Sequence, residues 1–120
     1  MVVPSANSNY MAVDQHLFFE LAMAFVGEIA FDADWYLATY PDLQDAIAAG
    51  SVASAHHHYV RFGYYEHRLP RKILVDEAWY LDVHKDVREA ISRRHYASGQ
   101  EHFQVSGYRE GRLPYPGFVL

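Results

Sequence analysis

This chain of 120 residues contains no cysteine, and its Lys and Arg residues are outnumbered by Asp and Glu, 10 to 15. Without cysteine there is no disulfide framework, no thiolate metal site and no cysteine nucleophile. Binding to nucleic acid relies on a basic surface that meets the phosphates. The net charge of −5 therefore argues against a nucleic-acid partner.

Targeting signals and long apolar runs are also missing. The first residues lack a basic region followed by an apolar run, so they do not resemble a signal peptide. The most apolar stretch, residues 17–30, contains Glu20 and Glu28 and is too short to cross a bilayer. We expect a cytoplasmic protein without a membrane span, and the sequence leaves export by a leaderless route open.

Aromatic residues are abundant: they make up 16% of the chain, and ten of them are tyrosines. Hydrophobic residues reach 51% and charged residues 21%, a composition typical of a folded protein rather than a disordered one. The length suits one compact domain.

The chain contains an internal repeat. Residues 31–70 align with residues 75–114 without a gap at an offset of 44, and 16 of the 40 aligned pairs are identical. Each copy is about as long as the smallest independently folding domains, so the two copies are expected to pack on each other.

Both copies show helical spacing. Apolar or semi-polar residues recur at every fourth position over 31–47 and 75–91. Pro41 disfavours a helix at the residue before it, so we predict one helix over 33–39 and another over 42–49 that ends at Gly50. The second copy has Lys85 in place of Pro41, which predicts a softer break.

The later part of each copy begins with a serine and ends near a glycine. Ser54 and Ser98 suit helix N-caps, and Ser98 with Glu101 forms a capping-box pattern. Gly63 and Gly107 stand where a left-handed C-terminal residue is expected.

We predict an all-α fold in which two tandem helical repeats of about 40 residues pack with an N-terminal helix. Asp14 is the expected cap of that helix. The predicted segments of one compact domain are a flexible N-terminus (1–13), the N-terminal helix (14–30), the two repeats (31–74 and 75–114) and a C-terminal tail (115–120). Leu17, Phe18, Leu21, Phe25 and Ile29 share one side of the N-terminal helix, and we expect this side to cover the repeats or a second copy of the chain.

The repeat resembles a short bacterial tandem repeat found beside glycosyltransferases of surface-polysaccharide synthesis and in some large secreted proteins. The matching residues read Phe-Asp-x-x-Trp-Tyr-Leu from Phe31, His-Tyr at His58 and Gly-Tyr-x-Glu-x-Arg-x-Pro from Gly63. The resemblance covers 80 residues and departs from the pattern at His67 and Lys85. It implies a small helical module attached to a larger assembly and brings no catalytic residues.

Five polar positions recur in both copies. A carboxylate beside a histidine suits acid–base catalysis, and it also satisfies a half-buried imidazole or guanidinium. Because an enzyme seldom needs two equal copies of one minimal site, we interpret these residues as structural networks. They are Asp32, Asp42, His58, Glu66 and Arg68 in the first copy, and Asp76, Asp86, His102, Glu110 and Arg112 in the second.

The eight histidines suggest a metal site, with His56, His58 and His67 as weak candidates. Consecutive helical residues point about 100° apart, and no pair of histidines has the spacing of four residues that helical metal sites use. We therefore predict no metal, no cofactor and no catalytic residues. The sequence also lacks a phosphate loop and a nucleophile elbow.

Tyrosines that do not recur are candidates for a binding surface, namely Tyr40, Tyr65, Tyr96 and Tyr115. The sequence thus favours a non-catalytic protein-interaction module or accessory subunit of a larger bacterial assembly, with a protein partner and with self-association through the N-terminal helix. Two alternatives stay open. One is a carbohydrate-binding module linked to surface polysaccharide, and the other is a metal protein with histidine and carboxylate ligands.

Overall fold

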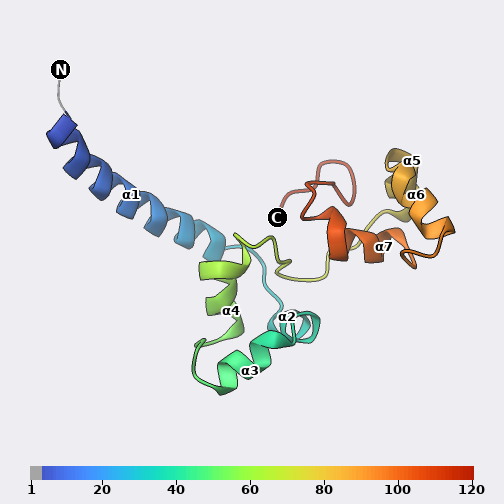
Figure 1. The fold of residues 1–120 in the computed structure, drawn as a ribbon, viewed down its shortest axis with the longest axis horizontal. Helices are drawn as coiled ribbons and strands as arrows, with labels where there is room; N and C mark the ends of the chain where they lie inside the picture. The colour runs from blue at the N-terminus through green and yellow to red at the C-terminus, as the bar shows by residue number, and fades with distance from the viewer. Residues whose placement is uncertain (1–3) are drawn as a thin grey trace.

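The computed structural model describes residues 4–120, and every regular element in that range is a helix, which confirms the all-α prediction (Figure 1). The elements are α1 (Pro4–Gly27), α2 (Ala33–Thr39), α3 (Asp42–Ala48), α4 (Ala55–His58), a π-helical turn η1 (Tyr59–Gly63), α5 (Glu77–Val83), α6 (Lys85–Ser92), α7 (Gly99–His102) and a second π-helical turn η2 (Phe103–Gly107).

Local capping explains where the short helices begin. Asp32 and Asp76 accept hydrogen bonds from the backbone N–H groups of Trp35 and Trp79, at 3.0 and 3.1 Å, and so start α2 and α5. Ser54 caps α4 in the same manner. At α7, Ser98 accepts from Glu101 N–H, and the Glu101 carboxylate reaches back to Ala97 N–H, one residue before the cap.

The predicted helix over 33–39 is present with those bounds, and α3 ends at Ala48, just before Gly50 in a left-handed conformation (φ 80°). The break between α5 and α6 persists although Lys85 replaces Pro41. It narrows to one residue, His84, whose carbonyl accepts a hydrogen bond from the Arg88 N–H at 3.2 Å and so starts α6 one residue earlier than α3. The break also interrupts the row of apolar residues at every fourth position, because Val83, a member of that row, is exposed.

The N-terminal helix begins much earlier than predicted. α1 starts at Pro4, so Asp14 lies inside the helix and residues 4–13 are helical rather than flexible. Residues 1–3 of the predicted flexible segment lie outside the described residues. Proline suits a first helical turn, and no glycine or proline interrupts residues 5–26. Serine and asparagine weaken a helix but do not stop one that is already formed.

Gly63 and Gly107 do not take the predicted left-handed conformation. They close the two π-helical turns, and the left-handed residues come four positions later, at His67 (φ 61°) and Gly111 (φ 80°). The turns are marked by hydrogen bonds from Tyr64 N–H to Tyr59 C=O and from Tyr108 N–H to Phe103 C=O, both at 2.9 Å. A different constraint, described below, requires glycine at these two positions.

Buried residues form two separate clusters. The first contains Val26, Tyr36, Leu43, Ala55 and Tyr59. The second contains Leu69, Ile73, Tyr80, Val87 and Phe103. Trp35 of α2 packs against the second cluster and so links the two halves, and Phe118 and Leu120 of the C-terminal tail pack there too.

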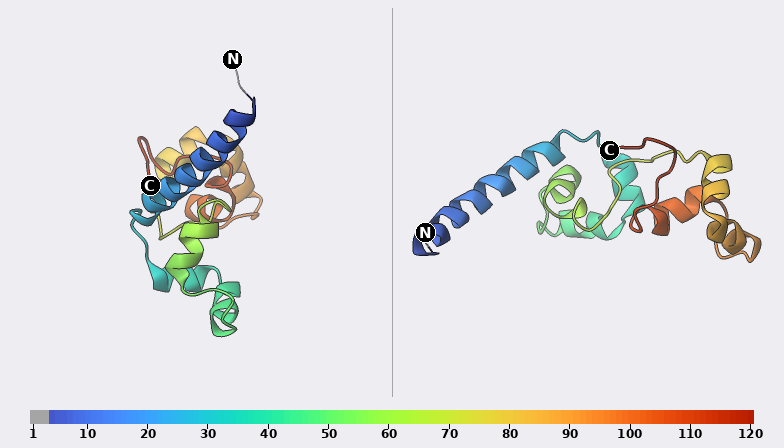
Figure 2. Two further views of the ribbon diagram at one scale, coloured as in Figure 1. Left: turned by 90° about the vertical axis from the view of Figure 1, so that its left-hand side faces the viewer. Right: turned by 90° about the horizontal axis from the view of Figure 1, so that it is seen from above.

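The molecule is elongated rather than the compact domain expected from its length. Its radius of gyration is 18.8 Å and its extents are 58 × 43 × 22 Å, whereas a compact chain of this length has a radius of about 14 Å. Two causes are visible: the core is divided in two, and α1 runs away from the other helices (Figure 2). Within residues 4–120, no helix is both long enough and apolar enough to cross a membrane.

Candidate functional site

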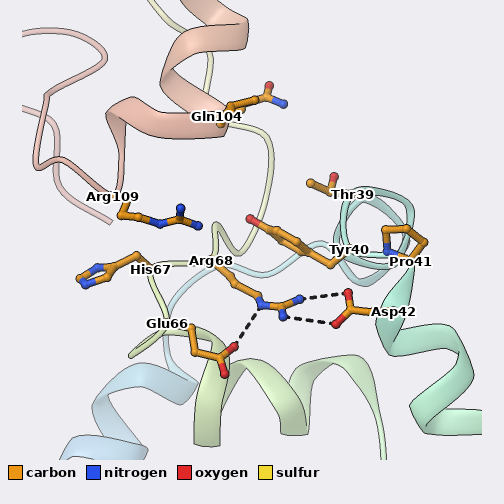
Figure 3. A pocket seen from close by; sticks show the side chains of 10 residues that line it. Thr39, Tyr40, Pro41, Asp42, Glu66, His67, Arg68, Gln104 and Arg109 are labelled. Atoms are coloured by element: carbon orange, nitrogen blue, oxygen red, sulfur yellow. Dashed lines mark hydrogen bonds and ion pairs between the residues drawn. The ribbon is translucent and has the colours of Figure 1, made fainter.

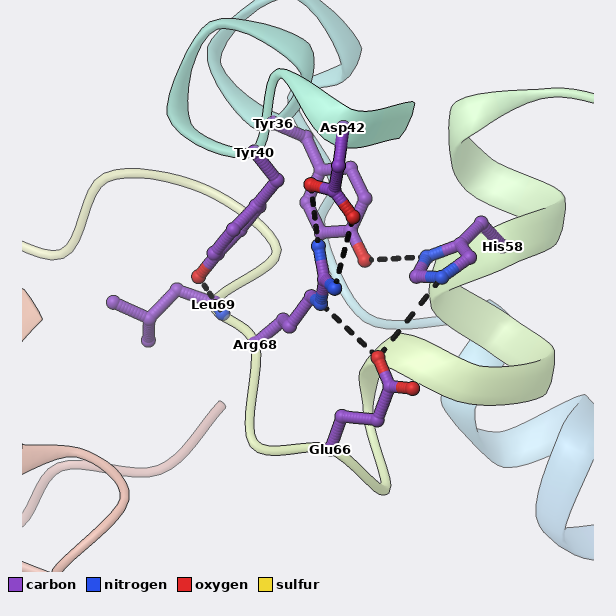
Figure 4. A network of polar contacts seen from close by, with 7 residues as sticks. All are labelled: Tyr36, Tyr40, Asp42, His58, Glu66, Arg68 and Leu69. Atoms are coloured by element: carbon purple, nitrogen blue, oxygen red, sulfur yellow. Dashed lines mark hydrogen bonds and ion pairs between the residues drawn. The ribbon is translucent and has the colours of Figure 1, made fainter. Parts of the chain in front are cut away.

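A buried tyrosine and a buried histidine meet in the first half of the chain (Figure 4). Tyr36 of α2 is fully buried, and its hydroxyl lies 2.9 Å from Nδ1 of His58, at the end of α4. The other ring nitrogen of His58 faces Glu66 at 4.0 Å, a distance of electrostatic attraction rather than a hydrogen bond. Burial lowers the pKa of His58, so its ring is neutral at pH 7.

Arg68 completes this group of side chains. It donates through Nε to Glu66 at 3.0 Å and through its two terminal nitrogens to the Asp42 carboxylate, at 3.3 Å each. The guanidinium also lies 4.8 Å from the centre of the Tyr40 ring. The hydrogen bond from Arg68 lowers the pKa of Asp42, which holds that carboxylate in its charged form.

The second half has the same contacts at positions 44 residues later. Tyr80 lies 2.8 Å from Nδ1 of His102, whose Nε2 faces Glu110 at 3.7 Å. Arg112 binds Glu110 at 3.0 Å and Asp86 at 2.8 and 2.6 Å. Its hydrogen bonds to Asp86 are shorter than those of Arg68 to Asp42, and they lower the pKa of Asp86 to about 2.

The two tyrosines explain the glycines of the π-helical turns. A Cβ atom built on Gly63 would overlap the Tyr36 hydroxyl, and one built on Gly107 would overlap the Tyr80 hydroxyl. Both positions therefore need glycine so that the backbone can approach the tyrosine. The sequence analysis predicted instead that these glycines end helices. Each glycine follows its tyrosine by the same 27 residues, and this shared spacing was the only sign in the sequence that the two positions are linked.

Eight of the ten residues predicted to form the networks lie in these two groups. Asp32 and Asp76 do not, which corrects the prediction: their carboxylates are engaged as the caps of α2 and α5. Their backbone N–H groups bond the carbonyls of Pro70 and Pro114 at 3.0 Å, so the start and the end of each unit meet there.

The candidate metal ligands do not converge. His58 is bonded to Tyr36, whereas the ring of His56 packs 5.1 Å from that of Phe31 and His67 stands in the left-handed turn. The described residues contain no group of three or more His, Asp or Glu residues placed to hold an ion.

A polar cleft lies between the two halves (Figure 3). It has a volume of about 530 Å³ and is lined on one side by Tyr40, Asp42, Glu66 and Arg68. Arg109 faces them from the second half, and Gln104 also lines the cleft. Among the side chains that the structure describes, no carboxylate forms an ion pair with Arg109. Sequence reasoning missed Arg109 because Tyr65 occupies its position in the first copy.

A second, apolar groove opens where α1 meets the C-terminal tail. Its volume is about 720 Å³, and its lining consists mainly of aromatic and aliphatic side chains. These are Phe25, Ile29, Tyr64, Tyr65, Tyr108, Val119 and Leu120. Phe25 also belongs to the exposed side of α1, so the groove and that helix face form one surface.

The structure distributes the four candidate tyrosines over different places. Tyr40 lines the polar cleft, where its hydroxyl accepts the Leu69 N–H at 2.8 Å, and Tyr65 lines the apolar groove. Tyr96 is half-buried, with its hydroxyl 3.0 Å from that of Ser106. Tyr115 packs edge-on against Phe118. The four therefore do not make one common surface.

Comparison of the chain with protein-family models, curated proteins and solved structures found no match. The resemblance to a polysaccharide-associated repeat therefore stays a prediction.

Proposed function

We propose that this chain is a non-catalytic protein-interaction module, an accessory subunit of a larger bacterial assembly, built from two copies of one helical unit. In this proposal α1 is the element that contacts the partner. The observation that carries it is the exposed apolar side of α1, formed by Leu17, Phe18, Leu21 and Phe25. Adjoining exposed apolar side chains, unlike single scattered ones, often mark a binding surface.

The polar networks support the non-catalytic part of the proposal. His58 and His102 are only 7% and 5% exposed, and each has one ring nitrogen bonded to a tyrosine and the other facing a carboxylate. The guanidinium groups neutralise those carboxylates in turn. General acid–base catalysis needs a group that reaches the substrate, whereas these groups are engaged with one another.

The test is affinity purification from the native cell with the natural chain and with a Phe18→Glu/Leu21→Glu variant. We expect a partner protein that is recovered with the natural chain, lost with the variant, and bound by the purified natural chain in a two-component titration. The control is Leu74→Glu, an equally drastic change at a residue that is 69% exposed and lies outside α1. Equal recovery of the partner by the α1 variant would contradict the proposal.

A second candidate function, binding of a small polar ligand such as a sugar, is favoured by the polar cleft. Its volume lies within the range of ligand sites, and Arg109 and Gln104 bring donors that the networks do not use. Because Arg68 covers one face of Tyr40, recognition there would depend on hydrogen bonds more than on ring stacking.

Calorimetric titration with neutral and acidic oligosaccharides tests this second function. Binding that weakens at least tenfold in Arg109→Ala and is kept in Arg93→Ala would support it, since Arg93 pairs with Glu89 on the surface of α6. Binding that Arg109→Ala leaves unchanged would count against the cleft.

A further inference from the structure

The exposed side of α1 is a continuous stripe. At about 100° per residue, Leu17, Leu21, Phe25 and Phe18 fall within an arc of about 100°. These four side chains are 53%, 61%, 71% and 73% exposed. Val26, on the other side of the helix, is 2% exposed and packs with the first core cluster. The helix thus has apolar residues on two sides, and the molecule covers only one of them.

The area of this surface approaches what a stable interface needs. With about 200 Å² for a whole leucine or phenylalanine side chain, the stripe exposes on the order of 500 Å². A standard-size interface buries about 800 Å² per partner. Tyr65 and Val119, exposed at the rim of the adjoining groove, extend the surface toward that figure.

The surface is also complementary to itself. Phe18 projects from the stripe, and the apolar groove opens seven residues later, at Phe25. Seven residues are close to two helical turns, so the projection and the groove share one face of α1 about 10 Å apart. A two-fold axis between them places Phe18 of each copy over the groove of the other, which is the arrangement of a closed, isologous dimer.

Charge favours the antiparallel direction. α1 contains Asp14 and Glu20, Glu28 directly follows the helix, and no Lys or Arg occurs before Arg61. In a parallel pair of helices, each carboxylate would lie beside the same carboxylate of the other copy. In the antiparallel arrangement the two Glu28 residues lie about 20 Å apart along the helix axis, beyond the screening length of about 8 Å, whereas the two Glu20 residues remain about 5 Å apart along it. The antiparallel direction therefore relieves the Glu28 pair but not the Glu20 pair.

We propose that the partner of α1 is a second copy of this chain, bound as an antiparallel dimer in which Phe18 of each copy enters the groove lined by Phe25, Tyr65 and Val119 of the other. This inference rests on the proposed function, in which α1 is the contact element, and specifies the partner: the protein recovered by a tagged chain through α1 is then the untagged copy of the same chain.

Molar mass in solution is the first test. Light scattering after size exclusion at about 100 µM chain should give twice the mass of 13.8 kDa for the natural protein and for Leu74→Glu. Phe18→Glu/Leu21→Glu should give the single mass with an unchanged circular dichroism spectrum, because both side chains are exposed in the single chain. A monomeric natural protein, or a dimeric double variant, would overturn the proposal.

Disulfide trapping tests the direction of the helices, since the chain has no cysteine of its own. With Phe18 of one helix beside Phe25 of the other, the two Leu21 side chains lie next to the two-fold axis. The two Leu17 side chains lie about 13 Å apart along the helix axis. Leu21→Cys should therefore form a dimer on mild oxidation and Leu17→Cys should not. Equal trapping of both variants would mean parallel helices and would refute the antiparallel dimer.

Salt distinguishes a second copy from a different partner. Copies that each carry a net charge of −5 repel one another, so the dimer should tighten when salt is raised from 50 to 500 mM. If the natural chain is monomeric, and a cellular protein that it recovers is not recovered by Phe18→Glu/Leu21→Glu, the dimer is refuted and the proposed function still stands. If that variant changed neither the mass nor the recovered proteins, both proposals would fail.

Discussion

Tyr59 and Phe103 occupy the same position of the two units, and both rings are fully buried. Only Tyr59 carries a hydroxyl, and within the described residues that hydroxyl has no hydrogen-bond partner. Tyr36, by contrast, is just as buried, but its hydroxyl meets His58. The cost of a buried hydroxyl therefore depends on whether the surroundings provide a partner.

At this scale we expect Tyr59→Phe to stabilise the protein by about 1 kcal/mol, because the change removes an unsatisfied buried group and keeps the ring. The second unit already accommodates phenylalanine at this position. Urea unfolding followed by circular dichroism measures the change. The matched control, Tyr36→Phe, should lose about 1 kcal/mol, since it leaves His58 Nδ1 without its partner. A loss of stability in Tyr59→Phe would show that the hydroxyl is satisfied after all.

At the scale of single elements, the helices differ in how well they could be predicted. α2 has the predicted bounds because its cap, Asp32, and its terminator, the Tyr40-Pro41 pair, are local signals. The π-helical turns η1 and η2 were not predicted. They depend on the close approach of Gly63 to Tyr36 and of Gly107 to Tyr80, residues 27 positions apart in the sequence.

The π-helical turns give the prediction that belongs to this scale. Gly63→Ala and Gly107→Ala should each lower the free energy of unfolding by about 2 kcal/mol, because the new methyl group displaces a tyrosine hydroxyl from its histidine. Gly27→Ala, at the end of α1 where a Cβ meets open space, is the control and should leave stability unchanged or slightly raised. Differential scanning calorimetry of the three variants gives the comparison. Alanine tolerated at position 63 would argue against the close packing of Tyr36 on this turn.

At the scale of the whole molecule, the two networks couple stability to pH. Burial lowers the pKa of His58 and of His102 below the ordinary value of 6.5, so near that pH the unfolded chain binds more protons than the folded one. The pKa of Asp86 is lowered as well, from 3.8 to about 2, because Arg112 stabilises its charged carboxylate. Near pH 3 the unfolded chain therefore binds more protons at this residue than the folded one.

Stability should therefore fall on acidification in two stages. The first begins as the pH drops below about 6.5, where the unfolded histidines take up protons that the buried rings resist. The second lies between about pH 4 and pH 2, where the Asp86 carboxylate is protonated and its contribution is lost. Urea midpoints from pH 8 to pH 2 measure both stages. A midpoint that stays constant from pH 7.5 to pH 5 would contradict the first, and Asp86→Asn should reduce the second.

Features that depend on neighbours along the chain could be predicted from the amino-acid sequence. It predicted the helical class, the bounds of α2 and the serine caps of α4 and α7, because a cap and the backbone groups that it satisfies lie within a few residues. Eight of the ten residues that were predicted to form the two networks lie in them, because the same polar side chains occur twice at one spacing.

The way in which these elements combine became visible in the three-dimensional structure. It moved Asp32 and Asp76 from the networks to helix caps, divided the core into two clusters and left one side of α1 uncovered. Arg109 gained its place in the polar cleft in the same way, from the position of one unit against the other. Such features depend on contacts between residues far apart in the sequence, and helical periodicity does not specify which apolar face meets which.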